Sequence, residues 1–128
     1  MAYLLDTNVV IDLRDGEETV VRNVRALTQR PFISIVTRVE LEGGLHRDAR
    51  DVEARRARLM VILEGLSALP FDADAADVYG RILAATGYSR RKVLDRMIAA
   101  QALLHRLALV TRNPDDFADV PGLDLLAW

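Results

Sequence analysis

Short apolar runs without polar alternation constrain the fold of this sequence more than any other feature. Three are clear, at residues 2–5, 32–36 and 107–110, and two weaker ones span 66–71 and 123–128. Strands that are apolar on both faces are typical of a parallel sheet covered on both sides. We therefore predict a parallel sheet of four to five strands, with the two weaker runs at its edges.

Helical patterns separate these runs. Apolar residues recur at helical spacing in five stretches, at residues 9–13, 20–27, 51–65, 72–86 and 94–105. Gly87 follows the fourth stretch as a plausible C-cap, and the fifth is apolar on nearly every face, which predicts an internal helix. Strands alternating with helices indicate an α/β domain, and right-handed crossovers place helices on both faces of the sheet.

Composition narrows the possible functions. The 128 residues fit a single domain, 1–128, with a net charge of −2, which is not typical of a protein held on nucleic acid by bulk charge. The chain has no Cys and only two His, which excludes disulfides, thiolate metal sites and cysteine nucleophiles. No apolar run approaches ~18 residues and no signal-peptide pattern opens the sequence. We therefore expect no membrane association and a cytoplasmic protein.

Acidic residues follow the predicted strands. Asp6 ends the first apolar run, Glu40 lies just beyond the second, and Asp95 begins the internal helix. Asp115 and Asp116 follow the third run. Because function in such folds gathers at the carboxyl ends of parallel strands, we expect these side chains to converge on one crevice.

Each acid also has a purely structural interpretation. Asp6 could serve only as a helix N-cap, and Thr37-x-x-Glu40 is a capping-box pattern. Asp95 could simply interact favourably with the dipole at the start of its helix. The other residues on the same face of that helix are apolar, however, and a half-buried carboxylate there needs a partner. The acids after the third run are common turn residues. Acidic residues at all four strand-end and helix-start positions together are more informative than any one of them alone.

Carboxylates that share one crevice repel one another, and a divalent cation relieves the conflict. Only oxygen ligands are available here, which favours Mg²⁺ or Mn²⁺ over zinc. A carboxylate-held Mg²⁺ most often handles phosphate groups. Four polar residues flank the acids and could position them or a water molecule: Thr7, Asn8, Thr111 and Asn113.

Four segments together resemble the PIN domain family and, within it, the VapC toxins. In chain order they are Leu4-Leu5-Asp6-Thr7-Asn8, Thr37-x-x-Glu40-Leu41, Asp95-x-x-Ile98-Ala99-Ala100 and Leu109-Val110-Thr111-x-Asn113-x-x-Asp116-Phe117. Residues 69–80 and 120–128 are also similar to VapC toxins, so the resemblance covers essentially the whole chain. It implies a PIN-like α/β/α sandwich around a central parallel sheet.

The resemblance also implies an activity and partners. It implies a Mg²⁺- or Mn²⁺-dependent endoribonuclease that leaves 5′-phosphate and 3′-hydroxyl ends, the toxin of a VapBC-type toxin–antitoxin pair. Such toxins form homodimers and are blocked by a VapB-like antitoxin. Carried over by position, Asp6, Glu40, Asp95 and Asp116 are the acidic quartet. We then expect Asp6 and Asp95 as direct metal ligands, Asp116 as a ligand acting directly or through water, and Glu40 as the group that either orients the attacking water or completes the coordination shell.

The sequence leaves the identity of two catalytic acids and of the RNA-binding residues open. Asp115 could take the role of Asp116, and Glu42 could take that of Glu40. Five basic residues near the acids are candidates for binding RNA phosphates, against the alternative of a solvated charged face: Arg90, Arg91, Lys92, Arg96 and Arg112.

Rival functions also remain. The chain could be a catalytically silent PIN-like module that binds RNA or protein, or a metal-free ribonuclease that uses His46 and His105, which lie outside the strand-end clusters. A phosphoacceptor receiver domain is disfavoured because the only lysine, Lys92, precedes a helix rather than following a strand. A phosphatase with an Asp-x-Asp motif is disfavoured because Asn8 stands at the second position.

Overall fold

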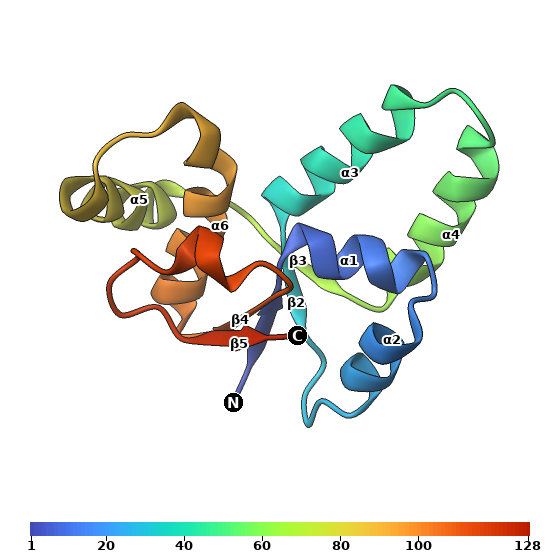
Figure 1. The fold of residues 1–128 in the computed structure, drawn as a ribbon, viewed down its shortest axis with the longest axis horizontal. Helices are drawn as coiled ribbons and strands as arrows, with labels where there is room; N and C mark the ends of the chain where they lie inside the picture. The colour runs from blue at the N-terminus through green and yellow to red at the C-terminus, as the bar shows by residue number, and fades with distance from the viewer.

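A five-stranded, wholly parallel sheet forms the centre of the molecule (Figure 1). The computed structural model describes all 128 residues, and the order across the sheet is β3-β2-β1-β4-β5. The strands are β1 (Tyr3–Leu5), β2 (Phe32–Ser34), β3 (Ser67–Leu69), β4 (Ala108–Thr111) and β5 (Leu125–Ala127). Each predicted apolar run supplies a strand, with β4 extending one residue beyond its run to Thr111, and the two weaker runs supply the edges, as expected.

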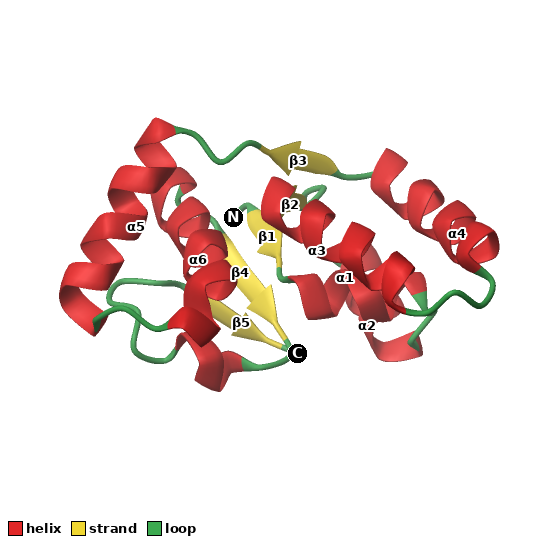
Figure 2. Ribbon diagram, turned by 90° about the horizontal axis from the view of Figure 1, so that it is seen from above, coloured by secondary structure: helices red, strands yellow, loops and turns green.

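Helices cover both faces of this sheet. They are α1 (Thr7–Arg14), α2 (Glu18–Arg25), α3 (Ile35–Arg47), α4 (Val52–Glu64), α5 (Ala73–Thr86) and α6 (Val93–His105), with single 3₁₀ turns η1 (Arg90–Lys92) and η2 (Pro114–Phe117). Figure 2 shows α1 to α4 on one side of the sheet and α5 and α6 on the other. The predicted α/β/α architecture is confirmed. None of the helices has the length and apolar content needed to cross a membrane.

Two hydrophobic cores result, one on each face of the sheet. Leu4 and Leu109 point into the core under α5 and α6, whereas their neighbours Leu5 and Val110 point into the core under α1 to α4. Successive strand residues face opposite sides, which explains why the central strands carry no polar alternation. All four side chains are fully buried.

The second strand is shorter than predicted, because a helix begins inside the apolar run. Ser34 caps α3, its Oγ accepting a hydrogen bond of 2.9 Å from the Val36 amide. The capping-box interpretation of Thr37 and Glu40 is therefore wrong, since both residues lie within the helix rather than at its start. Their side chains are free for contacts with the end of β1.

Helix α6 is anchored deep in the molecule, as its apolar pattern predicts. Ile98, Ala99 and Ala100 are completely buried, and Gln101 donates from Nε2 to the carbonyls of Leu69 and Pro70, each at 3.0 Å. These bonds fix α6 against the connection from β3 to α5. The first turn of α6, which carries Asp95, is thereby held on a rigid support.

Candidate active site: an acidic cluster at the carboxyl ends of the strands

Asp6 stands at the centre of the site, directly after β1 and as the N-cap of α1. Its Oδ1 accepts from the Thr7 amide at 2.8 Å and its Oδ2 accepts from Thr111 Oγ1 at 2.8 Å. The residue is only 5% exposed. Asp6 is therefore a helix cap, but it is also tied to the end of β4, and both of its oxygens are fixed in direction.

The hydroxyl groups of Thr37 and Thr7 form a hydrogen-bonded chain that ends at Glu40. Thr7 Oγ1 donates to Glu40 Oε1 at 2.8 Å and lies 2.9 Å from Thr37 Oγ1. A hydroxyl has one proton to give, so Thr37 must be the donor to Thr7. This orders a relay from Thr37 through Thr7 to Glu40. Sequence reasoning missed Thr37 as a site residue, because its place one turn before Glu40 suggested only a cap.

Asp95 and Asp116 bring the third and fourth carboxyl groups. Asp95 lies half-buried in the first turn of α6, and Asp116 lies in η2 after β4. Burial raises the pKa of Asp95 to about 6, with further contributions from the charges of Asp6, Asp116 and Glu40. Burial likewise raises the pKa of Asp6, against the hydrogen bonds from Thr111 and Thr7, and Glu40 and Asp116 add to the rise. Residues from four separate segments therefore share one electrostatic field.

The donor set fits a hard divalent cation. Every candidate ligand is a carboxylate or hydroxyl oxygen, the type that Mg²⁺ and Mn²⁺ prefer. Burial first, and then the charges of the neighbouring acids, raise the pKa of Asp6 and Asp95. No three acidic side chains are gathered into a closed ligand set. The charges of these acids act unfavourably on one another, and a divalent cation would relieve that repulsion.

The two ambiguous acids have different surroundings from the cluster. Glu42 accepts from Arg56 of α4 at 3.1 and 2.9 Å and lies 3.5 Å from Arg38, and these arginines hold its pKa below the usual value. Asp115 is exposed and is not among the principal charges acting on Asp6 or Asp95. Glu40 and Asp116, rather than these neighbours, are the acids whose charges raise the pKa of Asp6 and Asp95.

The remaining polar residues support the loop after β4. Asn113 donates its amide to Thr111 Oγ1 at 3.0 Å, so this hydroxyl accepts from one side and donates to Asp6 on the other. Asn8 Oδ1 accepts from the Arg112 amide at 3.4 Å. These bonds join the segment after β1 to the segment after β4, where the acids meet.

Comparison with known proteins identifies the family. A model of the PIN domain matches residues 3–123. The chain belongs to the PIN domain family. It is 32% identical to the tRNA(fMet)-specific endonuclease VapC of Shigella flexneri, covering 100% of this chain and 98% of that relative. It is also 32% identical to ribonuclease VapC5 of Mycobacterium tuberculosis, covering 94% of this chain and 89% of the relative.

Solved structures of VapBC complexes have the same fold as this PIN domain. The VapBC2 complex of Rickettsia felis, bound to a DNA fragment from its promoter, aligns with a TM-score of 0.88 at 26% identity, covering 100% of this chain and 99% of the matched chain. DNA-bound VapBC of Salmonella typhimurium aligns with a TM-score of 0.86 at 28% identity, covering 100% and 98%. The resemblance expected from the four motifs is confirmed at the level of family and fold.

The structure of this PIN domain corrects one expectation about its basic residues. Arg96 is only 3% exposed, and its guanidinium donates to Asp119 Oδ2 at 2.9 Å and to Thr86 Oγ1. It is therefore not a surface contact for RNA. The sequence contained a signal for this burial, since Arg96 lies in the helix predicted to be internal.

The other basic candidates lie at the surface. Arg90 and Arg91 are exposed in η1, immediately before α6, and Lys92 Nζ lies 3.9 Å from Asp119 Oδ2. Arg112 is held by Glu17 at 3.1 Å and by Asp12 at 3.3 Å. Of these residues, Lys92 acts on the cluster directly, because its charge lowers the pKa of Asp95.

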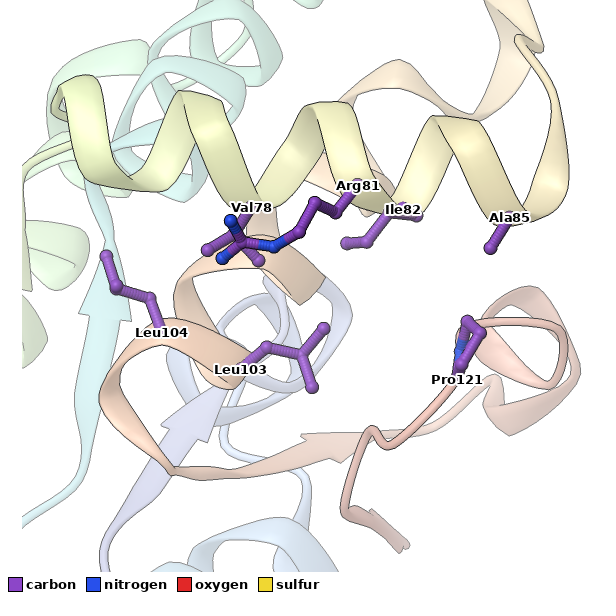
Figure 3. Close-up of a pocket in the computed structure, with 7 residues that line it drawn as sticks. All are labelled: Val78, Arg81, Ile82, Ala85, Leu103, Leu104 and Pro121. Atoms are coloured by element: carbon purple, nitrogen blue, oxygen red, sulfur yellow. The ribbon is translucent and has the colours of Figure 1, made fainter.

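Neither histidine belongs to the acid cluster of this PIN domain. His46 lies in the last turn of α3, where Nε2 is 3.4 Å from Arg56, and His105 is exposed at the end of α6. The apolar groove in Figure 3, of about 360 Å³, runs between α5 and α6 beside Pro121. Its lining includes no acidic residue, so it is separate from the candidate active site.

Proposed function

We propose that this PIN domain is a Mg²⁺- or Mn²⁺-dependent endoribonuclease and the toxin of a VapBC-type pair. The observation that carries the proposal is the electrostatic coupling of four oxygen-ligand side chains, since burial together with the charges of Glu40 and Asp116 raises the pKa of both Asp6 and Asp95. The relatives named ribonuclease and tRNA endonuclease support the choice of RNA as substrate.

Asp6, Asp95 and Asp116 are the residues that would hold the cation. A bound Mg²⁺ or Mn²⁺ lowers the pKa of water and stabilises charge on phosphate oxygens. Thr111 and the Thr7 amide keep Asp6 pointing in one direction, which is the kind of outer support that tunes a metal site. Asp95 exchanges its proton near pH 6, so it is available as a carboxylate at neutral pH.

Glu40 is the residue proposed to orient the attacking water. One of its oxygens, Oε1, is occupied by the Thr7 hydroxyl at 2.8 Å, which leaves Oε2 to accept a proton. The relay from Thr37 through Thr7 limits rotation of this carboxylate. A general base must be held within hydrogen-bond reach of the proton that it takes, and this relay supplies that restraint.

RNA is proposed to contact the basic rim beside Asp95. Arg90 and Arg91 are exposed in η1 and form no ion pair in the structure, while Tyr88, in the same connection, is 71% exposed. Arginine contacts suit phosphates, and an exposed aromatic ring can stack on an unpaired base. Lys92 and Arg112 are the further proposed phosphate contacts, although Arg112 must loosen its bonds to Glu17 and Asp12 to take part.

An antitoxin similar to VapB is the proposed protein partner, as in the solved VapBC complexes. The surface proposed for it is the apolar groove of about 440 Å³ between α1, α2 and α4, which includes Val24, Leu27, Ile62 and Leu66. An antitoxin arginine that enters the acid cluster would complete the block. The homodimer implied by the resemblance belongs to the same proposal, as does the cytoplasmic location expected from the sequence.

Cleavage of total cellular RNA by the purified chain tests the activity. We expect discrete fragments with Mg²⁺ or Mn²⁺, none with excess EDTA, and none from Asp6→Asn. Asp77→Asn is the matched control, because Asp77 is an exposed acid of α5. Cleavage that persists in EDTA would refute the acidic mechanism, and a folded, antitoxin-free chain that cuts no RNA would favour the silent binding module.

A further inference from the structure

Arg96 is the buried charge that the proposed mechanism does not use. Its side chain connects three segments: α6, where it is rooted, the end of α5 through Thr86 Oγ1, and the turn after η2 through Asp119 Oδ2 at 2.9 Å. Thr86 Oγ1 in turn donates to the carbonyl of Ile82 at 2.9 Å. We call Arg96, Thr86 and Asp119 the Arg96 brace.

The two ends of the brace lie beside two of the four acids. Arg96 immediately follows Asp95 in the first turns of α6, and Asp119 lies three residues beyond Asp116. The turn between Asp116 and Asp119 is further pinned by Phe117, which is 1% exposed in the core under α6. A rigid link between Arg96 and Asp119 therefore limits how far Asp116 can move from Asp95.

Stability alone does not account for an arginine at this place. Removing a guanidinium from water is costly, and a well-packed apolar side chain is often as stabilising as a buried ion pair. The brace also leaves Arg96 Nε without a partner. What the ion pair adds over an apolar residue is direction, because one guanidinium nitrogen of Arg96 donates to Asp119 while another donates to Thr86, and both donors belong to one rigid planar group.

The site requires such a restraint. Asp95 and Asp116 repel each other, and Asp116 is an exposed residue of a single 3₁₀ turn rather than of a long helix. Repulsion would move this turn outward unless something holds it. We propose that Arg96 and Asp119 are positioning residues that keep Asp116 close enough to Asp95 for the two carboxylates to share one cation. This inference rests on the proposed function.

The test is the affinity for Mn²⁺, measured by isothermal titration calorimetry, together with the Mg²⁺ dependence of RNA cleavage. Asp119→Ala removes the carboxylate, and the fold should tolerate this change because the Asp119 side chain is 46% exposed. Asp119→Asn keeps an acceptor for the guanidinium. Orienting groups of this kind are typically worth 10–100-fold in metal affinity. We expect Mn²⁺ affinity to fall in that range in Asp119→Ala, to recover partly in Asp119→Asn, and to fall no further when Arg96→Met is added.

Two controls separate the brace from charge effects. Asp124→Ala removes an exposed acid of the same segment that forms no ion pair, and it should leave Mn²⁺ affinity unchanged. Lys92 shares Asp119 with Arg96, so Asp119→Ala could act by releasing Lys92 toward Asp95. In a Lys92→Met background the loss of Mn²⁺ affinity should persist if the brace acts by position, and it should vanish if the released lysine is the cause.

Several results would overturn the inference. If Asp119→Ala lowers the melting temperature but leaves Mn²⁺ affinity and Mg²⁺ dependence as in the wild type, the brace is structural only. If the loss disappears in the Lys92→Met background, the positioning role is refuted. A wild-type chain that neither binds Mn²⁺ nor cleaves RNA would instead refute the proposed function, and the inference would fall with it.

Discussion

Asp95→Asn should stabilise the metal-free protein, because the folded state buries the Asp95 carboxylate and places it near other negative charges. The pKa of Asp95 rises from its ordinary 3.8 to about 6 through burial and the charges of Asp6, Asp116 and Glu40. Each pKa unit corresponds to about 1.36 kcal/mol, so ionising Asp95 in the folded state costs at most ~3 kcal/mol. Since the side chain is half-exposed, solvent screening reduces this to roughly half.

The substitution also has an opposing effect. A negative charge in the first turn of a helix is worth roughly 0.3–1 kcal/mol, and Asn gives up that benefit in α6. The net gain is about 1 kcal/mol at pH 7.5, which corresponds to a rise of roughly 3–5 °C in melting temperature for a domain of this size. The exposed-acid control Asp77→Asn should change the melting temperature by less than about 1 °C.

The pH dependence follows from the direction of the shift. The folded state binds the Asp95 proton more tightly than the unfolded chain, so this contribution to stability is present below pH 4 and is lost as pH rises through about 6. The advantage of Asp95→Asn should therefore be full at pH 7.5 and absent near pH 4. Thermal denaturation in EDTA at both pH values measures it. A variant that is less stable than the wild type at pH 7.5 would refute the claim that the cluster carries uncompensated charge.

Other substitutions probe the supporting contacts. Thr111→Val removes the donor at 2.8 Å from the buried Asp6 Oδ2, so urea unfolding should show a loss of about 1–3 kcal/mol, accompanied by weaker cleavage; unchanged stability would contradict the contact. Gln101→Leu leaves the carbonyls of Leu69 and Pro70 without their donor and should cost a similar ~1–3 kcal/mol in urea unfolding. Changing Arg90 and Arg91 to Gln should reduce the slope of log affinity for RNA against log salt by roughly 1–2 and leave the melting temperature unchanged; an unaltered slope would remove both arginines from the RNA contact.

The sheet and most of the helices are predictable from the sequence, because the physical signal is local. A strand such as β4, predicted from the apolar run at residues 107–110, must be apolar on both faces to lie inside a covered parallel sheet, and the structure places it between β1 and β5. The nearness of Asp6 to Asp95 also follows from topology, since Asp6 follows the end of β1 and Asp95 lies at the start of α6, and the alternation of strands and helices fixes the direction of both elements.

What the sequence did not reveal depends on three-dimensional choices between similar residues. Ser34 and Thr37 are both good caps, and only the geometry at the end of β2 selects Ser34. That selection frees Thr37 for the relay to Glu40. The ambiguity between Asp115 and Asp116 is of the same kind, because adjacent residues of a 3₁₀ turn point in different directions that no linear pattern records.

The measurement that tests the central claim most directly is single-turnover cleavage of RNA across a Mg²⁺ titration by the wild type, Asp116→Asn and Asp115→Asn. The two variants make the same chemical change at adjacent exposed positions. We expect the wild type and Asp115→Asn to show saturable, Mg²⁺-dependent cleavage, and Asp116→Asn to lose it. Cleavage without Mg²⁺, or cleavage that depends on Asp115 and not on Asp116, would contradict the assignment of one cation to the cluster formed by Asp6, Asp95 and Asp116.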